Sequence, residues 1–363
     1  MPPTALRPRR LALACALALA FAACSGDRTD PTAPDAVSAA RGGAPGPDLR
    51  AAIAAQERAT GRLLQNDGVA GTAVGLTADG RPAVKIFATH GAVGGLPRAL
   101  DGIPVVVEVT GPFRAELPRA EGKGGAPAKK PGGGGGSANP TSRFARPVPI
   151  GVSTGNVGEC SAGTIGARVK RGSSYYALSN NHVFALENTA QLGSQILQPG
   201  RYDTNCAWST ADVIGTLAKF VPISFGSDNE VDAALASVTT ATVGNATFSG
   251  GYGVPGSTPV AASVGLAVQK CGRTTKCTTG TVSAVNATIN VQYSAGVARF
   301  VHQVVVSGNK GSFSRAGDSG SLIVTNTAAA APVALLFAGS NTSTIGNPIG
   351  TVLSKLGVGI DGK

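Results

Sequence analysis

Short apolar runs separated by turn residues fill the chain from residue 148 to its end, and this pattern constrains the fold more than any other feature. Each run has the length of a single strand, and Gly, Asn, Ser and Thr lie between the runs. Nine or more strands at this spacing predict an all-β barrel or sandwich over residues 148–363. Helical spacing is expected only over residues 349–356. The runs include TIGARVK, SYYALS, DVIGTLAKF, VDAALASV, GTVSAV, TINVQY, FVHQVVVS, SLIV and PVALLFAG.

Residues 48–116 have a different pattern and predict a small α/β domain in front of the β-rich region. An aspartate precedes an Ala- and Arg-rich stretch of helical length, and two apolar runs flank an Asp-Gly turn. The expected elements are a helix over 49–65 capped by Asp48, strands over 69–76 and 84–88 joined at Asp79-Gly80, and a strand over 103–111.

The composition changes again over residues 117–147, which hold five consecutive glycines at 132–136 among Pro, Lys and Ala. Ordering glycine costs conformational entropy, and glycine has no side chain to bury. This segment is therefore expected to be a flexible linker and a site open to proteolytic nicking.

The first residues have the features of an export signal. Three arginines precede the apolar run 11–22, which is too short for a permanent membrane span. The run ends in FAACSGD, which resembles the lipobox of bacterial lipoproteins and makes Cys24 the expected lipidation site after removal of residues 1–23. The serine after Cys24 resembles sorting to an outer membrane. Residues 24–47 would then form a disordered tether, and an ordinary cleaved signal with a secreted product is the alternative.

Six cysteines leave four in the mature β-rich region once Cys15 and Cys24 are set aside. An even number in an exported chain indicates two disulfides with three possible connectivities. The pair Cys271–Cys277 closes a short loop, which leaves Cys160–Cys206 as the natural remainder. A zinc site is the competing interpretation, but the chain has no CxxC and no histidine beside these cysteines.

The net charge of +11 does not predict a nucleic-acid partner, because of where the charge lies. The signal contributes three positive charges, and residues 114–146 hold seven Lys or Arg against two Glu. Residues 150–363 hold 13 basic and nine acidic residues, an excess of only four. The excess thus falls in the leader and the linker and not on a folded face with interleaved aromatics.

A possible nucleophile lies in Gly317-Asp318-Ser319-Gly320. A serine hydroxyl needs a neighbouring base, usually histidine, that is itself oriented by a carboxylate. In a chain with 51 glycines the tetrapeptide alone also fits an ordinary tight turn. The prediction that Ser319 is catalytic therefore depends on the other residues of the chain.

Among the three histidines, His182 is the candidate base. His90 lies in the N-terminal domain, and His302 falls inside an alternating strand, where a half-buried structural histidine is expected. His182 follows an apolar strand and two asparagines in YYALSNNHVFALEN, so its ring can face a cleft. Asp232, at the start of an apolar strand in NEVDAALASV, is the candidate carboxylate because a nearly buried charge needs a partner.

The chain order His182, Asp232, Ser319 excludes the α/β-hydrolase order, in which a histidine follows the serine. The segments LSNNHVFA, NEVDAALA and GDSGSL resemble the His, Asp and Ser motifs of trypsin-like serine peptidases. RPVPIGVSTGN, LQPGRYDTN, the GRTT stretch 272–275 and LLFAGSNTSTIGNPIGTVL resemble a bacterial branch related to the plant narrow-leaf-type peptidases. The resemblance covers most of residues 146–357.

The resemblance implies a mainly β fold, a chymotrypsin-like double β-barrel behind the α/β domain, with the three residues in the cleft between barrels. Ser319 would attack the scissile carbonyl, His182 would carry the proton, and Asp232 would orient the imidazole. The backbone N–H groups of Gly317 and Ser319 would form the oxyanion hole. The base of the specificity pocket would fall near Phe313, so an acidic base is not expected, and residues 337–340 would form another wall. No metal or organic cofactor is required.

The predicted function is an exported serine endopeptidase that acts on protein or peptide substrates and is anchored to the cell envelope by lipid. A catalytically silent β-barrel module that binds peptides or a protein partner at the cell surface is the alternative. A third hypothesis is a protease that cuts only itself, with the N-terminal domain as an inhibitory or folding-assisting segment released by a cut between Leu117 and Pro147.

Overall fold

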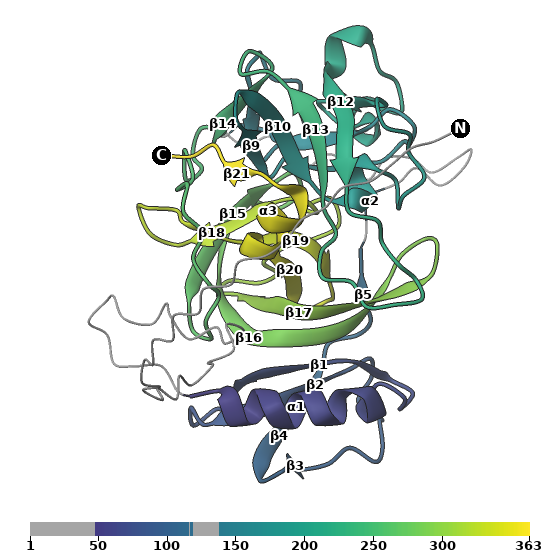
Figure 1. The fold of residues 1–363 in the computed structure, drawn as a ribbon, viewed down its shortest axis with the longest axis vertical. Coiled ribbons are helices and arrows are strands. Elements are labelled where there is room, and N and C mark those ends of the chain that lie inside the picture. The colour runs from purple at the N-terminus through teal and green to yellow at the C-terminus, as the bar shows by residue number, and fades with distance from the viewer. Residues whose placement is uncertain (1–47, 116, 119–137) are drawn as a thin grey trace, which may run out of the picture. The chain divides into compact units, whose positions relative to one another are not determined.

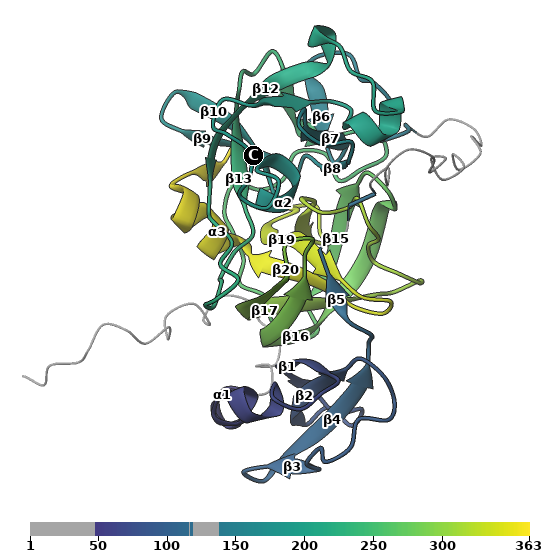
Figure 2. The same cartoon turned by 90° about the vertical axis from the view of Figure 1, so that its right-hand side faces the viewer.

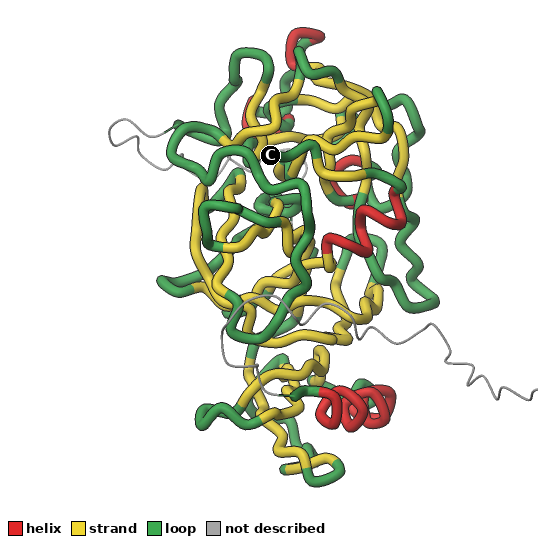
Figure 3. Tube along the Cα trace, turned by 60° about the vertical axis from the view of Figure 1, so that its left-hand side comes forward, coloured by secondary structure: helices red, strands yellow, loops and turns green. Residues whose placement is uncertain are grey.

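A computed structural model describes residues 48–115, 117–118 and 138–363 of the chain. The predicted signal peptide, the tether with Cys24 and most of the predicted linker lie outside these residues. The described part is mainly β, with few helices (Figure 3).

None of the helices in the described residues is both long enough and apolar enough to span a membrane.

The N-terminal region has one helix on a small sheet, as its sequence predicted. Helix α1 (Arg50–Leu63) follows Asp48, whose carboxylate accepts a hydrogen bond from the Arg50 N–H at 3.0 Å. Three of the six buried residues of α1 are alanine, and they lie on one face of the helix with Gln56, Thr60 and Leu63. The strands are β1 (Val69–Leu76), β2 (Pro82–Ala88), β3 (Ala99–Leu100) and β4 (Ile103–Val109), with β1 and β2 antiparallel across the predicted turn.

Eight strands form the sheet of the first barrel, in the order β21-β9-β10-β13-β12-β11-β7-β8. A parallel pair, β6 with β14, is connected to this sheet at β9 and at β7. Arg168 on β9 donates to the Val243 carbonyl on β14 at 2.7 Å, and β6 leads directly into β7. The strands are β6 (Val148–Ile150), β7 (Ser153–Asn156), β8 (Gly163–Thr164), β9 (Ala167–Arg171), β10 (Ser174–Ser179), β11 (Gln195–Leu197), β12 (Val213–Phe220), β13 (Ala234–Val238), β14 (Val243–Thr247) and β21 (Gly359–Ile360).

The second barrel is closed by hydrogen bonds all the way round. Its order is β15-β18-β19-β20-β17-β16, and β16 pairs again with β15, which leaves no open edge between them. The strands are β15 (Ala267–Gly272), β16 (Lys276–Gln292), β17 (Val297–Gly308), β18 (Leu322–Thr325), β19 (Pro332–Gly339) and β20 (Thr344–Pro348).

The N-terminal strands continue the sheet of the second barrel, which the sequence did not indicate. β1 pairs antiparallel with β16, and the two strands lie side by side in both ribbon views (Figures 1 and 2). A short strand, β5 (Phe113–Arg114), pairs with β16 and with β19. Phe113 is fully buried in a core that the N-terminal strands and the second barrel share. The predicted domain boundary at residue 116 stays a prediction. Strands from both sides of it, β1 and β5 before and β16 after, belong to one sheet.

A separate hydrophobic cluster joins the two barrels. Its side chains come from β9, β10 and β13 of the first barrel, from β18 and β19 of the second, and from helix α3 (Ile349–Leu356). α3 occupies the residues in which the sequence showed helical spacing. The mainly β fold, with two β barrels behind a small α/β region, confirms the predicted fold class.

Candidate active site

Strand pairing in the first barrel brings His182 and Asp232 together. β10 ends at Ser179 and pairs with β13, and the short helix α2 (Asn181–Phe184) follows β10 directly. Asp232 lies just before β13, so it faces the start of α2. The His182 Nδ1 lies 2.5 Å from Asp232 Oδ2, and the His182 backbone N–H donates to Oδ1 at 3.2 Å. Both side chains are fully buried.

Asp232 has further polar partners that hold its carboxylate and backbone in place. The Tyr293 hydroxyl, at the end of β16, donates to Asp232 Oδ2 at 2.8 Å. The Asp232 N–H donates to Asn347 Oδ1 at 2.9 Å, and Asn180 Nδ2 donates to the Asp232 carbonyl at 2.7 Å. Burial, together with the charge of Asp232, raises the pKa of Tyr293 well above its ordinary value. Tyr293 therefore keeps its proton and remains a donor to the carboxylate.

Ser319 lies in a turn between β17 and β18 that only glycine permits on both sides. Gly317 has φ +93°, and a methyl group there would lie 2.6 Å from Thr274 Oγ1. Gly320 has φ +94°, and a methyl group there would lie 2.2 Å from Ser179 Oγ, at the end of the strand that leads to His182. The glycines thus allow the serine turn to approach the first barrel closely.

Thr164 of the first barrel fixes this turn from the other side. Its N–H donates to the Ser319 carbonyl at 2.8 Å, and its hydroxyl donates to the Gly317 carbonyl at 2.9 Å. A methyl group at the adjacent Gly163 would lie 3.1 Å from the Ser319 carbonyl oxygen and 2.6 Å from Val183, the residue after His182. The Ser319 turn and the His182 helix therefore meet on either side of one glycine.

Three polar groups at this junction have no partner within the described part of the chain. His182 Nε2 is buried without a hydrogen bond, and no hydrogen bond joins it to Ser319 Oγ. The backbone N–H groups of Gly317 and Ser319 likewise donate to no acceptor among the described residues. Buried polar groups in proteins are usually satisfied, so groups left open together indicate a place for a ligand.

A buried ion pair lies under the serine turn. Asp318 accepts hydrogen bonds from the backbone N–H groups of Thr274, Thr275 and Arg315, and its Oδ2 lies 3.5 Å from Lys270 Nζ. Both side chains of the pair are fully buried. Burial lowers the pKa of Lys270, and the charge of Asp318 opposes this shift. The turn is thus attached by its own aspartate to the hairpin of β15 and β16.

The same hairpin is tied to the first barrel and closed by a disulfide. Arg273 donates twice to Asp203 of the 3₁₀ helix η1 (Arg201–Thr204), at 2.9 and 2.5 Å, and both side chains are nearly buried. The two disulfides are Cys160–Cys206 and Cys271–Cys277, the pairing that the short loop between Cys271 and Cys277 suggested.

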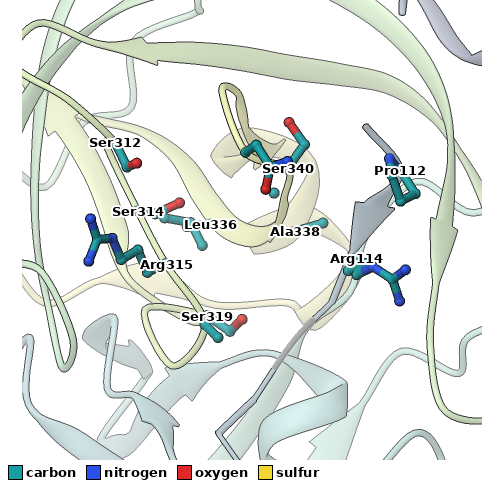
Figure 4. A pocket seen from close by; sticks show the side chains of 12 residues that line it. Pro112, Arg114, Ser312, Ser314, Arg315, Ser319, Leu336, Ala338 and Ser340 are labelled. Atoms are coloured by element: carbon teal, nitrogen blue, oxygen red, sulfur yellow. The ribbon is translucent and has the colours of Figure 1, made fainter. Parts of the chain in front are cut away.

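A cavity of about 510 Å³ opens beside Ser319 (Figure 4). The residues before the serine form one wall, with Ser312, Ser314 and Arg315, and β19 with the turn after it forms another. β5 adds Arg114, and the residue before β5 adds Pro112, on the opposite side of the cavity from Arg315. Phe313, predicted to lie at the pocket base, instead packs into the core of the second barrel. Of residues 337–340, expected in a wall, 338–340 line the cavity, but Phe337 is buried in the core of the second barrel.

The other two histidines lie apart from this arrangement. His90 is exposed, and so is His302, which was expected to be half-buried. His302 has φ +61° where the pairing of β16 and β17 is irregular, which turns its ring outward to Asn286 Oδ1 at 2.8 Å.

Sequence reasoning missed Tyr293, Lys270, Thr164 and the two arginines of the cavity. Two of them carried a detectable signal. Lys270 shares a strand face with Val268, and Tyr293 follows Ile289 and Val291 at alternate positions, so period two placed both in the core. A polar group at such a position requires a buried partner.

The two barrels, with His182 and Asp232 on the first and Ser319 on the second, define the chymotrypsin-like class of β fold. A family described as the Nal1 C-terminal domain matches residues 217–347, less than half of the chain. No curated protein matches the sequence.

Several solved structures are similar to this chain in part. Thermobifida fusca Protease A has 19% sequence identity and a TM-score of 0.43 over 60% of this chain and 99% of its own. A glutamic acid specific serine protease has 24% identity and a TM-score of 0.42, over 59% of this chain and 100% of its own. Cellulomonas bogoriensis chymotrypsin has 20% identity and a TM-score of 0.41, over 60% and 99%.

Proposed function

We propose that this chain is a serine endopeptidase that hydrolyses peptide bonds through an acyl-enzyme intermediate, with His182, Asp232 and Ser319 as its catalytic residues. One observation carries the proposal. The buried His182 ring is held at Nδ1 by Asp232, while its Nε2 is open beside a Gly-Asp-Ser-Gly turn that has two open N–H groups. A base oriented by a carboxylate, next to a serine and an oxyanion site, is the arrangement that acyl transfer requires.

In the first half of the reaction, Ser319 Oγ forms a bond to the scissile carbonyl carbon as His182 Nε2 takes the hydroxyl proton. The carbonyl oxygen becomes an oxyanion and accepts hydrogen bonds from the N–H groups of Gly317 and Ser319. Each such donor is worth roughly 10²–10³ in rate. The C–N bond then breaks, and His182 gives its proton to the leaving amine.

In the second half, a water replaces the amine. His182 Nε2 removes a proton from the water as its oxygen attacks the acyl carbon, and the proton returns to Ser319 Oγ when the ester bond breaks. Asp232 remains ionised throughout and stabilises the imidazolium that forms in each half. Tyr293 and the Asp318–Lys270 pair act as positioning residues, the first on the carboxylate and the second on the serine turn.

Labelling with a fluorophosphonate probe tests the proposal, because the probe forms an adduct only with an activated serine. We expect an adduct at Ser319 by mass spectrometry, and its loss in Ser319→Ala and in His182→Ala. Ser354→Ala, an exposed serine on α3, is the matched control and should label normally. Absence of labelling in folded wild-type protein would contradict the enzyme and favour the catalytically silent binding module.

We also propose that the chain is exported and anchored by lipid at Cys24. The two disulfides support this proposal, because disulfides persist in oxidising compartments. Cys24→Ala should move the protein from the membrane pellet to the soluble fraction after ultracentrifugation of expressing bacteria. Equal membrane fractions in the two forms would contradict the anchor and leave a cleaved, secreted product.

A further inference from the structure

The charge of the cavity beside Ser319 is distinctive. Two of the described residues that line it, Arg114 and Arg315, are positively charged, and no lining residue in the described part is negative. The two arginines lie on opposite sides of the cavity, with Ser319 at one end (Figure 4). A positive potential in a concave site attracts negatively charged groups and repels lysine or arginine side chains.

Asp318, the residue before the nucleophile, does not cancel this charge. Its carboxylate points to the β15–β16 hairpin, where it accepts hydrogen bonds from Thr274, Thr275 and the Arg315 N–H, and where Lys270 balances it. Only the backbone of Arg315 takes part in that network. The guanidinium group of Arg315 therefore remains a positive charge at the cavity.

Hydroxyl groups complete a lining that suits a carboxylate. Ser312 and Ser314 lie along one wall and Ser340 at the far end of the cavity from Ser319 (Figure 4). Ser314 Oγ lies 2.6 Å from Thr344 Oγ1, and when Thr344 is the donor in that hydrogen bond, the Ser314 hydroxyl proton is available to a ligand in the cavity. Leu336 and Ala338 provide the apolar surface for the methylene groups of a side chain.

Both guanidinium groups point away from the centre of the cavity in Figure 4. Arg315 is exposed, and exposed side chains change rotamer on the picosecond to nanosecond timescale. A substrate carboxylate in the cavity would provide the charge-assisted hydrogen bonds that favour inward rotamers, and guanidinium is well suited to bind it with two parallel bonds.

We infer that this cavity selects a substrate with an acidic side chain, glutamate or aspartate, immediately before the scissile bond, with Arg315 as its main determinant and Arg114 as a second. This inference rests on the proposed peptidase function and extends it to substrate class. It also assigns a role to β5, since Arg114 comes from the strand that follows the N-terminal α/β region and pairs with β19 at Gly339.

Four fluorogenic peptides that differ only in the residue before the cleaved amide, Glu, Gln, Phe or Lys, test the inference. The Glu and Gln side chains have the same shape, so their kcat/KM ratio reports charge alone. We expect Glu to exceed Gln by about ten- to hundredfold, the range for hydrogen bonds to charged groups. Arg315→Gln should reduce that ratio about tenfold, and Arg114→Gln by about threefold.

Arg315→Glu provides a gain that misfolding cannot imitate, because it should raise kcat/KM for the Lys peptide above that for the Glu peptide. Arg62→Gln, an exposed arginine on α1, is the matched control and should keep the wild-type ratio. All variants are first titrated with the fluorophosphonate probe, so that rates refer to active serine.

The outcomes separate the two proposals. Normal labelling of Ser319 with equal hydrolysis of Glu and Gln, or with Phe or Lys preferred, would overturn the acidic specificity and leave the peptidase intact. Absence of both labelling and hydrolysis in wild type would overturn the proposed function and the specificity with it.

Discussion

At the scale of single residues, the candidate site depends on buried polar side chains that hold the proposed catalytic residues in place. Tyr293 and Lys270 are the clearest cases. Each is buried, each reaches a carboxylate, and each lies far in sequence from the residue that it supports. Their contributions separate into an effect on His182, the proposed base, and an effect on the turn that holds Ser319, the proposed nucleophile.

Tyr293→Phe removes the hydroxyl donor of Asp232 and keeps the ring. We expect kcat/KM to fall about tenfold, the equivalent of one net hydrogen bond. The carboxylate that loses a donor interacts more strongly with imidazolium, so the acid limb of the pH profile should move to higher pH. Tyr252→Phe, which packs against the first-barrel core, is the control. An unchanged rate and an unchanged acid limb would exclude the positioning role.

Lys270→Met breaks the buried pair with Asp318 at nearly constant volume. We expect a loss of about 3 kcal/mol in the free energy of unfolding, measured with urea. Because burial lowers the pKa of Lys270, the unfolded chain binds more protons at this residue than the folded chain between the folded pKa and 10.5. The stability advantage of wild type over the variant should therefore grow as pH rises toward 10.5.

Adding Asp318→Asn to Lys270→Met should recover part of the lost stability, since the remaining carboxylate is then uncharged. If the two substitutions were additive, so that Asp318→Asn lowered the free energy of unfolding as much in Lys270→Met as in wild type, the two side chains would not interact.

At the scale of elements, the short 3₁₀ helix η2 (Thr210–Asp212) directly precedes β12 and contacts Arg143, which lies in the segment before β6. Ser209 and Asp212 form a capping box, and Asp212 also accepts hydrogen bonds from Arg143 at 2.6 and 3.0 Å. The Arg143 bond is the main reason that the pKa of Asp212 is lowered below 3.8. The carboxylate is buried, but the arginine is more than half exposed.

Arg143→Gln should lower the free energy of unfolding at pH 7 by at most about 1 kcal/mol, because solvent screens the exposed partner. A lowered pKa in the folded state stabilises above the ordinary pKa and is lost as pH falls through the folded value. The difference between wild type and variant should therefore begin to shrink near pH 3.8 in a denaturation series and disappear once the pH is below the folded pKa of Asp212. Arg58→Gln, from a pair exposed on both sides, should show a smaller effect. A difference independent of pH would contradict the assignment to Asp212.

Elements with a clear local signal could be predicted from the sequence. The hairpin strand Val69–Leu76 and the helix Ile349–Leu356 form where the apolar periodicity indicated. β8 and β5 could not be predicted, because two-residue strands carry no periodicity of their own. Both are nevertheless part of the candidate site, β8 through Thr164 and β5 through Arg114.

At the scale of the whole molecule, the N-terminal α/β region is built into the second barrel. β1 extends the sheet at β16, and the shared core includes Phe87, Phe113, Phe300 and Phe337. The self-cutting hypothesis requires that a cut in the predicted linker release this region. Because the sheet and the core are shared, we expect that such a cut would not release it by itself.

Residues 48–118 and 138–363 expressed as two chains in one cell should co-purify in equal amounts on a tag attached to either chain. Gly71→Ala should weaken this association, because the added methyl group would lie 2.4 Å from Ile289 Cγ2 on β16. Gly61→Ala, where a methyl group meets no atom within 4 Å, is the control. Separate elution of the two wild-type chains on size exclusion would support a removable N-terminal domain.

The sequence by itself determined the β class, the elements with clear periodicity, the number of disulfides and the order of the candidate residues, because periodicity, turn chemistry and chain order are local or countable. Only the tertiary structure decided which side chains surround those residues. Tyr293 reaches Asp232, Lys270 reaches Asp318 and Arg114 reaches the cavity through strand pairings that join segments far apart in the chain. The sequence pattern predicts which side chains of a strand are buried, but the register and closure of the sheets determine which other side chains they contact.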